Sequence, residues 1–300
     1  MVFKNLGFKN RLASSASHIR MIGDAVIIRH ILFSLPFAVL ALLLESGGHP
    51  PAKKVVLILL AAASARNAAN ALNRVVDAEI DARNHRTAGR HIPAGLLSKK
   101  SLLLFSALML GILVVSAALL NLLCVVLLPL ALILVGGYSY TKRFTWLCHY
   151  WLGLACAAAP MGAFVALSGT FKLSYFFLAG AHALWVAGFD IIYAGQDIEF
   201  DRREKLHSVP ARFGLKKARL LAAISHVGTV ILFLCLPLFW KLGWLYFTGI
   251  GISAILLASE HIIALGGSEK HIKIASYSIN EIIPLFILAF SVMDIYFGSL

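Results

Sequence analysis

The chain has 300 residues, of which 60% are hydrophobic and only 14% are charged, a composition too apolar for an ordinary soluble domain. Its formal net charge is +13, but the aromatic residues lie in apolar runs rather than between basic residues, so nucleic acid is not an expected partner. The four cysteines show neither CxxC nor zinc-site spacing, which indicates packing residues. Composition therefore predicts an integral membrane protein.

Nine apolar stretches follow one another along the chain, each long enough to cross a bilayer as a helix. The clearest is residues 101–141, which contain no Asp, Glu, Lys or Arg and can form two spans of about 20 residues each. A basic leader precedes the first stretch and no small-residue cleavage site follows it, so we expect an uncleaved first span. The predicted spans are 26–45, 54–78, 101–120, 122–141, 148–168, 172–193, 218–240, 243–265 and 273–297. The expected fold class is all-α, with nine transmembrane helices.

Alternate ends of nine spans lie on opposite sides of the membrane. One side carries only Lys53, Lys54, Lys172 and Lys241, so the side that holds the N-terminus carries the other 23 of the 27 Lys and Arg residues. Loops rich in Lys and Arg face the cytoplasm. The sequence therefore predicts a protein of the inner or plasma membrane whose N-terminus and active site are cytoplasmic.

Two segments on this basic side carry acidic residues at helical spacing. The first reads Asn73-x-x-x-Asp77-x-x-x-Asp81, and the second contains Asp197 and Asp201. Residues four apart on a helix lie on nearly the same face and are separated by about 6 Å along the axis. Ionisable groups at membrane depth mostly face a cavity or a partner, so we expect the two faces to form halves of one site. The alternative is that each Asp pairs with a nearby Arg and anchors a helix end.

An internal repeat favours the shared site. Residues 93–100 follow the first segment and residues 210–217 follow the second, and both begin Pro-Ala, contain Gly and end in two lysines. Two similar halves that direct their acidic helices toward each other build a site at the repeat interface. We therefore expect one domain over residues 1–300, with pseudo-repeats at about 26–141 and 148–265 and a last helix at about 273–297.

The chemistry of these segments suits Mg²⁺ and a diphosphate. Mg²⁺ binds through one or two carboxylates together with substrate phosphate oxygens, so two carboxylates from each segment suffice for about two ions. Basic side chains would neutralise the remaining phosphate charge, and the candidates are Arg66, Arg86, Arg90, Lys142, Arg143, Arg202, Arg203 and Lys205. If the diphosphate leaves an allylic carbon, a carbocation remains that aromatic faces can shield; the candidates are Tyr138, Tyr140, Trp146, Trp185 and Tyr193.

Residues 66–95 and 190–214 resemble the two signature segments of the UbiA-type membrane prenyltransferases, and Tyr138-Ser-Tyr-Thr-Lys142-Arg143 and the fifth span with Pro160 are similar as well. The resemblance implies a helical bundle around a central cavity that opens sideways to the lipid. It also implies Mg²⁺-dependent transfer of a polyprenyl group from its diphosphate to a ring carbon of an aromatic acid. The residues that match the metal and diphosphate positions are Asn73, Asp77, Asp81, Asp197 and Asp201. We take the four aspartates as catalytic residues and metal ligands. The substrate-binding candidates are Asn73, Arg66, Arg86, Arg90, Tyr138, Lys142, Arg143, Asp190, Tyr193 and Lys205.

The first segment departs from the family pattern at one position. The family often has Asn-Asp, whereas Arg74 follows Asn73 here, on a side of the helix about 100° away. The overall pattern looks most like the 4-hydroxybenzoate polyprenyltransferase-like members, which makes 4-hydroxybenzoate the first candidate acceptor, in ubiquinone biosynthesis. A hydroxynaphthoate acceptor in menaquinone biosynthesis is the alternative.

Three other classes of membrane protein compete with this interpretation. A transporter would share the repeat and the acids in the membrane, but its acids are expected at mid-depth rather than on one side. A phosphotransferase for CDP-alcohols would need an Asp-Gly-x-x-Ala-Arg run, which the chain lacks. A non-catalytic scaffold leaves both acidic faces unexplained.

Overall fold

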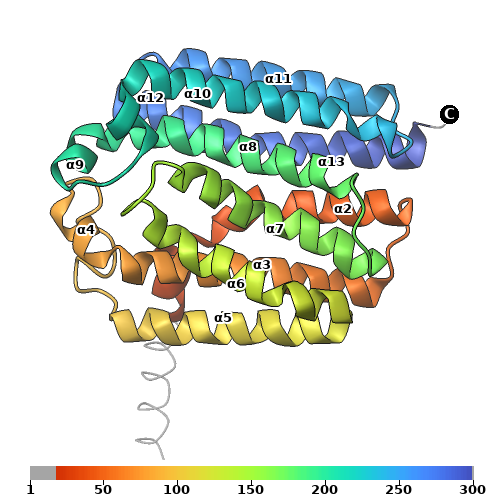
Figure 1. Ribbon diagram of the computed structural model, residues 1–300, viewed down its shortest axis with the longest axis horizontal. Coiled ribbons are helices and arrows are strands. Elements are labelled where there is room, and N and C mark those ends of the chain that lie inside the picture. The colour runs from red at the N-terminus through yellow and green to blue at the C-terminus, as the bar shows by residue number, and fades with distance from the viewer. Residues whose placement is uncertain (1–17, 299–300) are drawn as a thin grey trace, which may run out of the picture.

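The computed structural model describes residues 18–298, and all regular structure in this range is helical. Nine segments of this range are long and apolar enough to cross a membrane, which confirms the predicted fold class. They lie side by side along the longest axis of the molecule (Figure 1). The nine segments are His18–Ser46, Ala52–Val76, Lys99–Leu120, Leu122–Thr141, Cys148–Ser168, Tyr175–Arg203, Val209–Leu238, Trp244–Ala264 and Glu269–Phe297.

These segments contain the following elements. The longer helices are α2 (Leu35–Ser46), α3 (Ala52–Val76), α5 (Lys99–Leu120), α6 (Leu122–Thr141), α7 (Cys148–Ser168), α8 (Tyr175–Ala194), α10 (Val209–Leu234), α11 (Trp244–Ala264) and α13 (Asn280–Phe297). The short ones are η1 (Ile28–Phe33), α4 (Ala78–Arg83), η2 (Gly195–Asp197), α9 (Ile198–Arg203), η3 (Leu236–Leu238), α12 (Glu269–Lys273) and η4 (Ile274–Ile279).

Polar side chains set several helix ends. The Ser98 side chain accepts a hydrogen bond from Ser101 N at the start of α5. Asn121 separates α5 from α6, and its side chain accepts from Cys124 N while its amide donates to Val165 O at 2.9 Å. Such caps satisfy backbone groups that a helix end leaves unpaired. They also join this end of α6 to the end of α7.

The outer helices expose large apolar side chains. Leu104, Val126, Ile133 and Ile262 are all more than half exposed. A soluble monomer rarely exposes so much contiguous apolar surface, whereas lipid tails cover it at no cost. The exposed faces therefore define the lipid-facing surface of the bundle.

Small residues bring the inner helices into close contact. A Cβ atom added at Gly153 of α7 would lie 2.2 Å from Ala183 O of α8, and one at Gly188 of α8 would lie 2.2 Å from His226 Nε2 of α10. Membrane helices pack most closely where small residues allow their backbones to approach. α8 is therefore held tightly between α7 and α10.

Neither acidic segment is one continuous helix, contrary to the expectation from spacing. α3 ends at Val76, and Asp77, with φ −90° and ψ 0°, separates it from α4. In the second segment Asp197 closes the 3₁₀ turn η2, and α9 begins at Ile198. The chain bends at both points, and α4 and α9 lie together at one end of the bundle (Figure 1).

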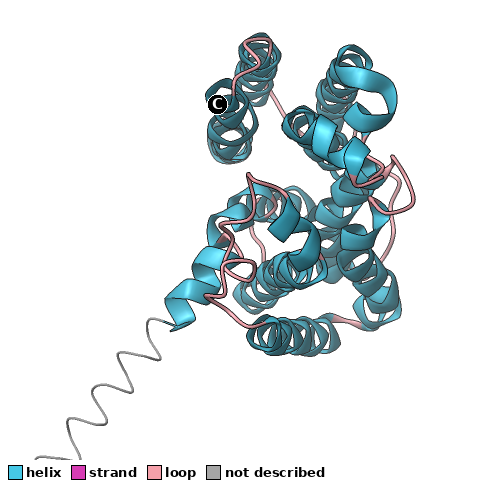
Figure 2. Cartoon of the chain, turned by 90° about the vertical axis from the view of Figure 1, so that its left-hand side faces the viewer, coloured by secondary structure: helices cyan, strands magenta, loops and turns pink. Residues whose placement is uncertain are grey.

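Two predicted span boundaries also differ from the structure. The seventh span begins at Val209 rather than at residue 218, because Ser208 caps α10 and Gly214 allows a kink with φ 78° inside it. The first span is interrupted by η1, which follows Ile27 at φ 50° and precedes α2. Figure 2 looks onto the end of the bundle where the short helices and the loops around them gather.

Candidate active site

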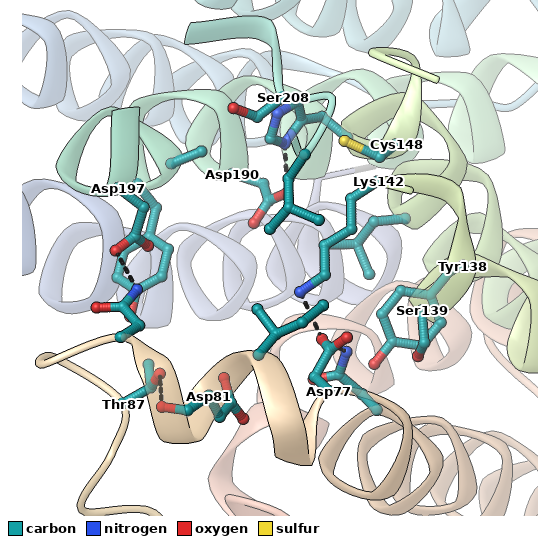
Figure 3. A pocket seen from close by; sticks show the side chains of 18 of the residues that line it. Asp77, Asp81, Thr87, Tyr138, Ser139, Lys142, Cys148, Asp190, Asp197 and Ser208 are labelled. Atoms are coloured by element: carbon teal, nitrogen blue, oxygen red, sulfur yellow. Dashed lines mark hydrogen bonds and ion pairs between the residues drawn. The ribbon is translucent and has the colours of Figure 1, made fainter. Parts of the chain in front are cut away.

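A cavity of about 250 Å³ lies at the end of the bundle where the two acidic segments meet. Asp77, Asp81, Asp197 and Asp201 all line it. Figure 3 shows Asp77 and Asp81 on one side of the cavity and Asp197 on another, although more than 100 residues separate the two segments. Tertiary packing therefore joins the two faces into one polar site.

Asp77 is surrounded by cations although it is only 2% exposed. Lys142 Nζ, which reaches it from the end of α6, lies 2.7 Å from Oδ2, and Arg143 Nη2 lies 3.2 Å from Oδ1. The Asn73 amide donates to Oδ2 at 2.8 Å. Burying a carboxylate costs free energy unless such hydrogen bonds from cations and amides compensate for the lost water. Arg143 also donates to Val76 O at 3.0 Å and does not line the cavity, so it supports the wall from behind.

Asp81 holds a second pair of cations. Arg90 Nη1 donates to both carboxylate oxygens at 2.7 Å, and Arg74 Nη1 lies 3.9 Å from Oδ2. Arg74 Nε also donates to Ala25 O at 3.1 Å. Arg74 lies about 100° around the helix from Asn73, but its side chain is long enough to reach the cavity, and Arg74 lines it. The departure from the family pattern thus places a guanidinium in the site.

Asp197 is held by the loop that follows α4. Arg86 donates to Asp197 Oδ1 at 3.0 Å and also pairs with Oδ2, and the Asn84 amide donates to Oδ1 at 2.8 Å. The Arg86 guanidinium lies over the Tyr193 ring, 4.9 Å from its centroid. Burial is the largest single influence and favours the neutral form of Arg86, but the hydrogen bonds to Asp197 and Tyr193 and the attraction to both groups together outweigh it and raise the pKa of Arg86 above its ordinary value. Arg86 therefore remains a cation in this site.

Asp190 anchors a different contact. Its Oδ2 lies 2.7 Å from His149 Nδ1, and Val209 N donates to His149 Nε2 at 3.3 Å. Because Nε2 accepts a hydrogen bond, Nδ1 carries the proton and donates to Asp190. This contact joins α8, α7 and the start of α10 at the cavity wall.

The other sequence candidates divide into two groups. Arg66, Tyr138 and Tyr193 line the cavity. The residues that do not line it are Tyr140, Trp146, Trp185, Arg202, Arg203 and Lys205. Of these, Lys205 is exposed at φ 55°, and Arg202 donates to Ala211 O at 2.9 Å. The basic residues at the end of α9 and just after it therefore lie outside the cavity lining.

Several lining residues carried no signal in the sequence. Asn84, His149 and Tyr277 belong to no acidic repeat and no charged periodicity, yet the first two hold site aspartates and the third lines the cavity. The sequence analysis named Arg86 and Arg90 of the loop after α4, but not Asn84 beside them. The contributions of Asn84, His149 and Tyr277 depend on contacts between distant segments.

The donor set fits Mg²⁺ bound together with a diphosphate. Among residues 18–298 no three His, Cys, Asp or Glu side chains converge closely enough to hold a metal by themselves. The carboxylates instead come as two pairs on one cavity. Mg²⁺ commonly takes one or two carboxylates and completes its octahedron with water and substrate phosphate oxygens. These side chains are suited to bind the ion with its substrate rather than alone.

Membrane-length helices around a polar cavity with paired aspartates and several cations define a membrane-embedded enzyme for an anionic substrate. A sequence model described as the UbiA prenyltransferase family matches residues 34–280, so the chain belongs to the UbiA prenyltransferase family. The chain is therefore a prenyltransferase, which confirms the predicted family and enzyme class.

Known relatives agree with this assignment. The chain is 33% identical over 229 residues to a 4-hydroxybenzoate octaprenyltransferase of Xanthomonas campestris, covering 75% of this chain and 74% of the relative. It is 31% identical over 228 residues to the enzyme of the same name from Vibrio cholerae, covering 74% and 78%. The apo structure of a UbiA homolog from Aeropyrum pernix superimposes with a TM-score of 0.81 at 32% identity, covering 89% of this chain and 98% of that one.

A more distant structure shares the fold. The UbiA homolog from Archaeoglobus fulgidus, bound to GPP and Mg²⁺, superimposes with a TM-score of 0.63 at 19% identity, covering 90% of this chain and 99% of that chain. At this identity the likeness shows the fold alone. The two proteins thus share one overall arrangement of the chain.

Proposed function

We propose that this prenyltransferase transfers a polyprenyl group from polyprenyl diphosphate to a ring carbon of an aromatic acid in quinone biosynthesis, with 4-hydroxybenzoate as the first candidate acceptor. The observation that carries the proposal is the meeting of two aspartate pairs, from distant segments, on one cation-rich cavity. The names of the Xanthomonas and Vibrio relatives support the acceptor.

The four aspartates are the groups that would hold Mg²⁺. Asp77 and Asp81 lie on one side of the cavity, and Asp197 and Asp201 come from the other segment. When bound, Mg²⁺ neutralises the diphosphate charge and makes it a better leaving group. The carboxylates supply the hard oxygen ligands that this ion prefers.

Cations now paired with the aspartates are placed to bind phosphate oxygens. Lys142 and Arg86 line the cavity and contact Asp77 and Asp197, respectively. Phosphate oxygens accept the same charge-assisted hydrogen bonds as carboxylate oxygens. These side chains stabilise the negative charge that develops as the bond from the prenyl carbon to the diphosphate breaks.

Arg66 supports an acidic acceptor. It lines the cavity at a depth about 16 Å along α3 from Asp77, as judged from the helical rise. Its Nη1 contacts Cys156 Sγ at 2.9 Å, and its buried Nε has no hydrogen-bond partner among the described residues. Arg66 as a whole is half-buried, but a buried donor such as its Nε is costly when it has no partner, so an anionic group of the ligand is the natural partner. The carboxylate of an aromatic acid meets this requirement.

The experiment uses membranes that contain the full chain, incubated with labelled polyprenyl diphosphate, Mg²⁺ and either 4-hydroxybenzoate or a hydroxynaphthoate. We expect a prenylated acid with the first acceptor, and loss of the product in Asp77→Asn and Asp197→Asn. Glu79→Gln is the matched control, because Glu79 lies in the same segment with its side chain 80% exposed. Hydrolysis of the diphosphate without a prenylated product from either acceptor would overturn the proposed acceptor class.

The basic loops support a cytoplasmic position for this site, since the cavity lies at the end of the bundle that carries most of the Lys and Arg residues. A cysteine introduced at Lys205, which is exposed at this end, would test it. We expect a membrane-impermeant thiol reagent to label it only after the cells are opened. Labelling of intact cells would contradict the proposed orientation.

A further inference from the structure

The last membrane segment contains a π-helical turn beside the cavity. η4 is a π-helix that lies between α12 and α13. A π-turn widens the helix, disturbs the regular hydrogen-bond ladder, and is often found at functional sites. Ser276 and Tyr277 of this turn both line the cavity. The irregular backbone of this segment therefore forms part of the cavity wall.

Its cause is a buried amide at the next residue. Asn280 is 0% exposed, and its Nδ2 donates to Ala275 O at 3.0 Å and to Ser276 O at 3.4 Å. Its Oδ1 accepts from Trp185 Nε1 of α8 at 2.7 Å. A buried polar network of this kind specifies one local geometry, because each unmade bond would leave a costly unpaired group. Asn280 and Trp185 thus hold the π-turn in register with α8.

Its consequence is the placement of one ring. The Tyr277 ring stacks against His30 at 5.6 Å and meets the edge of Tyr193 at 5.2 Å. Further ring contacts follow: the ring centroids of His30 and Phe33 are 5.1 Å apart, and those of Phe33 and Phe189 are 5.5 Å apart. All five residues line the cavity, and we refer to them as the aromatic wall.

The aromatic wall begins at the diphosphate end of the site. Tyr193 accepts a hydrogen bond from Arg86 Nη1, and Arg86 pairs with Asp197. Tyr277 is the neighbour of Tyr193 along the wall. The ring that the π-turn presents therefore lies next to the residues proposed to hold the leaving group.

We infer that Tyr277 shields the reacting allylic carbon, and that Asn280 is a positioning residue that sets the Tyr277 ring through the π-turn. This inference rests on the proposed function. In transfer, the bond from C1 of the prenyl group to the diphosphate oxygen breaks and its electron pair leaves with the diphosphate. A ring carbon of the acceptor then bonds to C1 and loses its proton to water. In the competing reaction, water bonds to C1 through its oxygen, loses a proton and yields the prenyl alcohol.

An aromatic face at C1 acts on this competition in two ways. Its electron-rich surface stabilises the cation while the acceptor attacks, and its apolar bulk keeps water away. The quantity to measure is therefore the ratio of prenylated acid to prenyl alcohol. Diphosphate release is measured alongside it and gives the total number of prenyl diphosphates cleaved. A merely structural residue would lower both products together and leave this ratio unchanged.

The test compares three tyrosine variants with the wild-type chain in membranes. We expect Tyr277→Leu to lower the ratio of prenylated acid to prenyl alcohol about tenfold while diphosphate release continues, and Tyr277→Phe to retain the wild-type ratio. Tyr296→Leu is the control, because Tyr296 lies on α13 and bonds Gly48 O, outside the cavity lining. A wild-type ratio in Tyr277→Leu would overturn the inference.

The role of Asn280 is tested through the same ratio. We expect Asn280→Leu to lower it in the same direction, and the double variant with Tyr277→Leu to be no worse than Tyr277→Leu alone. Trp185→Phe keeps an aromatic ring at this position but removes the Nε1 donor to Asn280, so it provides the test if Asn280→Leu does not fold. A wild-type ratio in a folded Asn280→Leu or, failing that, in Trp185→Phe would overturn the positioning role.

The wild-type arm separates the two proposals. If the wild-type chain forms no prenylated acid with either acceptor, the proposed function is wrong and this inference falls with it. If the wild-type chain forms product and the Tyr277 variants do not change the ratio, only this inference is wrong.

Discussion

The Asn84 amide donates a 2.8 Å hydrogen bond to Asp197, which lies 113 residues further along the chain. Asn84 also accepts from Arg86 N at 3.0 Å, so the same side chain shapes the loop that delivers Arg86 to Asp197. This loop follows α4, whereas Asp197 closes η2. The contact therefore connects the two acidic segments directly.

Removing this amide should disturb substrate binding. A hydrogen bond to a charged group contributes about 1.5–3 kcal/mol, so we expect Asn84→Ala to lower kcat/KM for polyprenyl diphosphate about tenfold or more. Asn84→Asp should be worse, because it places a carboxylate against Asp197. Steady-state kinetics at a series of polyprenyl diphosphate concentrations measures kcat/KM for both Asn84 variants. Asn121→Ala is the control. Asn121 caps the start of α6, whereas the cavity lies at the other end of that helix, where Lys142 is found, so loss of Asn121 should reduce stability but not kcat/KM.

Lys142 should matter more than the exposed cations. Its Nζ lies 2.7 Å from Asp77 Oδ2 at the cavity, so we expect Lys142→Gln to reduce kcat/KM about 100-fold, the usual effect of losing a preorganised charge-stabilising group. Arg203→Gln should have no effect, because the Arg203 side chain is 67% exposed and lies outside the cavity. Equal losses in the two variants would show that overall positive charge, rather than the site, is responsible.

Arg66 should discriminate between the two substrates. If it binds the acceptor carboxylate, Arg66→Gln should raise the KM for the aromatic acid about 30-fold, as expected for a buried charge pair, and leave the KM for polyprenyl diphosphate unchanged. Each KM is measured with the other substrate saturating. Arg83→Gln is the control, because Arg83 pairs with Glu204 at 2.8 Å on the surface. A parallel rise in both KM values would contradict the assignment.

Gly153 should be intolerant of any side chain. An added Cβ would lie 2.2 Å from Ala183 O, where the backbones of α7 and α8 touch, so we expect Gly153→Ala to destabilise the protein by about 1–3 kcal/mol. Thermal inactivation in detergent measures the loss. Gly162→Ala on the same helix is the matched control, because nothing lies within 4 Å of its added Cβ. Equal stability of the two variants would contradict the close contact.

Removal of divalent cations should abolish transfer and weaken substrate binding. Without Mg²⁺ the four aspartates repel the diphosphate, so we expect EDTA to stop product formation and excess Mg²⁺ to restore it. Equilibrium binding of labelled polyprenyl diphosphate with and without EDTA is a second readout that does not depend on turnover. Binding that is unchanged by EDTA would contradict a metal-assisted diphosphate site.

Local properties of the sequence were sufficient to predict the fold class. Apolar runs report how much of a segment prefers lipid, and nine such runs correspond to the nine membrane-length segments within residues 18–298. The spacing of Asp77 and Asp81, and of Asp197 and Asp201, likewise predicted two acidic faces. Both signals come from residues close together in sequence, and both are independent of the partners that each helix later meets.

The arrangement of the site depended on contacts that spacing does not report. The chain breaks its helices at Asp77 and Asp197, directs Arg74 into the cavity, and brings Asn84 to a partner 113 residues away. The π-turn that contains Tyr277 is followed by Asn280, whose side-chain amide accepts a hydrogen bond from Trp185 of α8. Buried polar groups must find hydrogen bonds wherever packing places them, so their partners are decided only when the helices assemble.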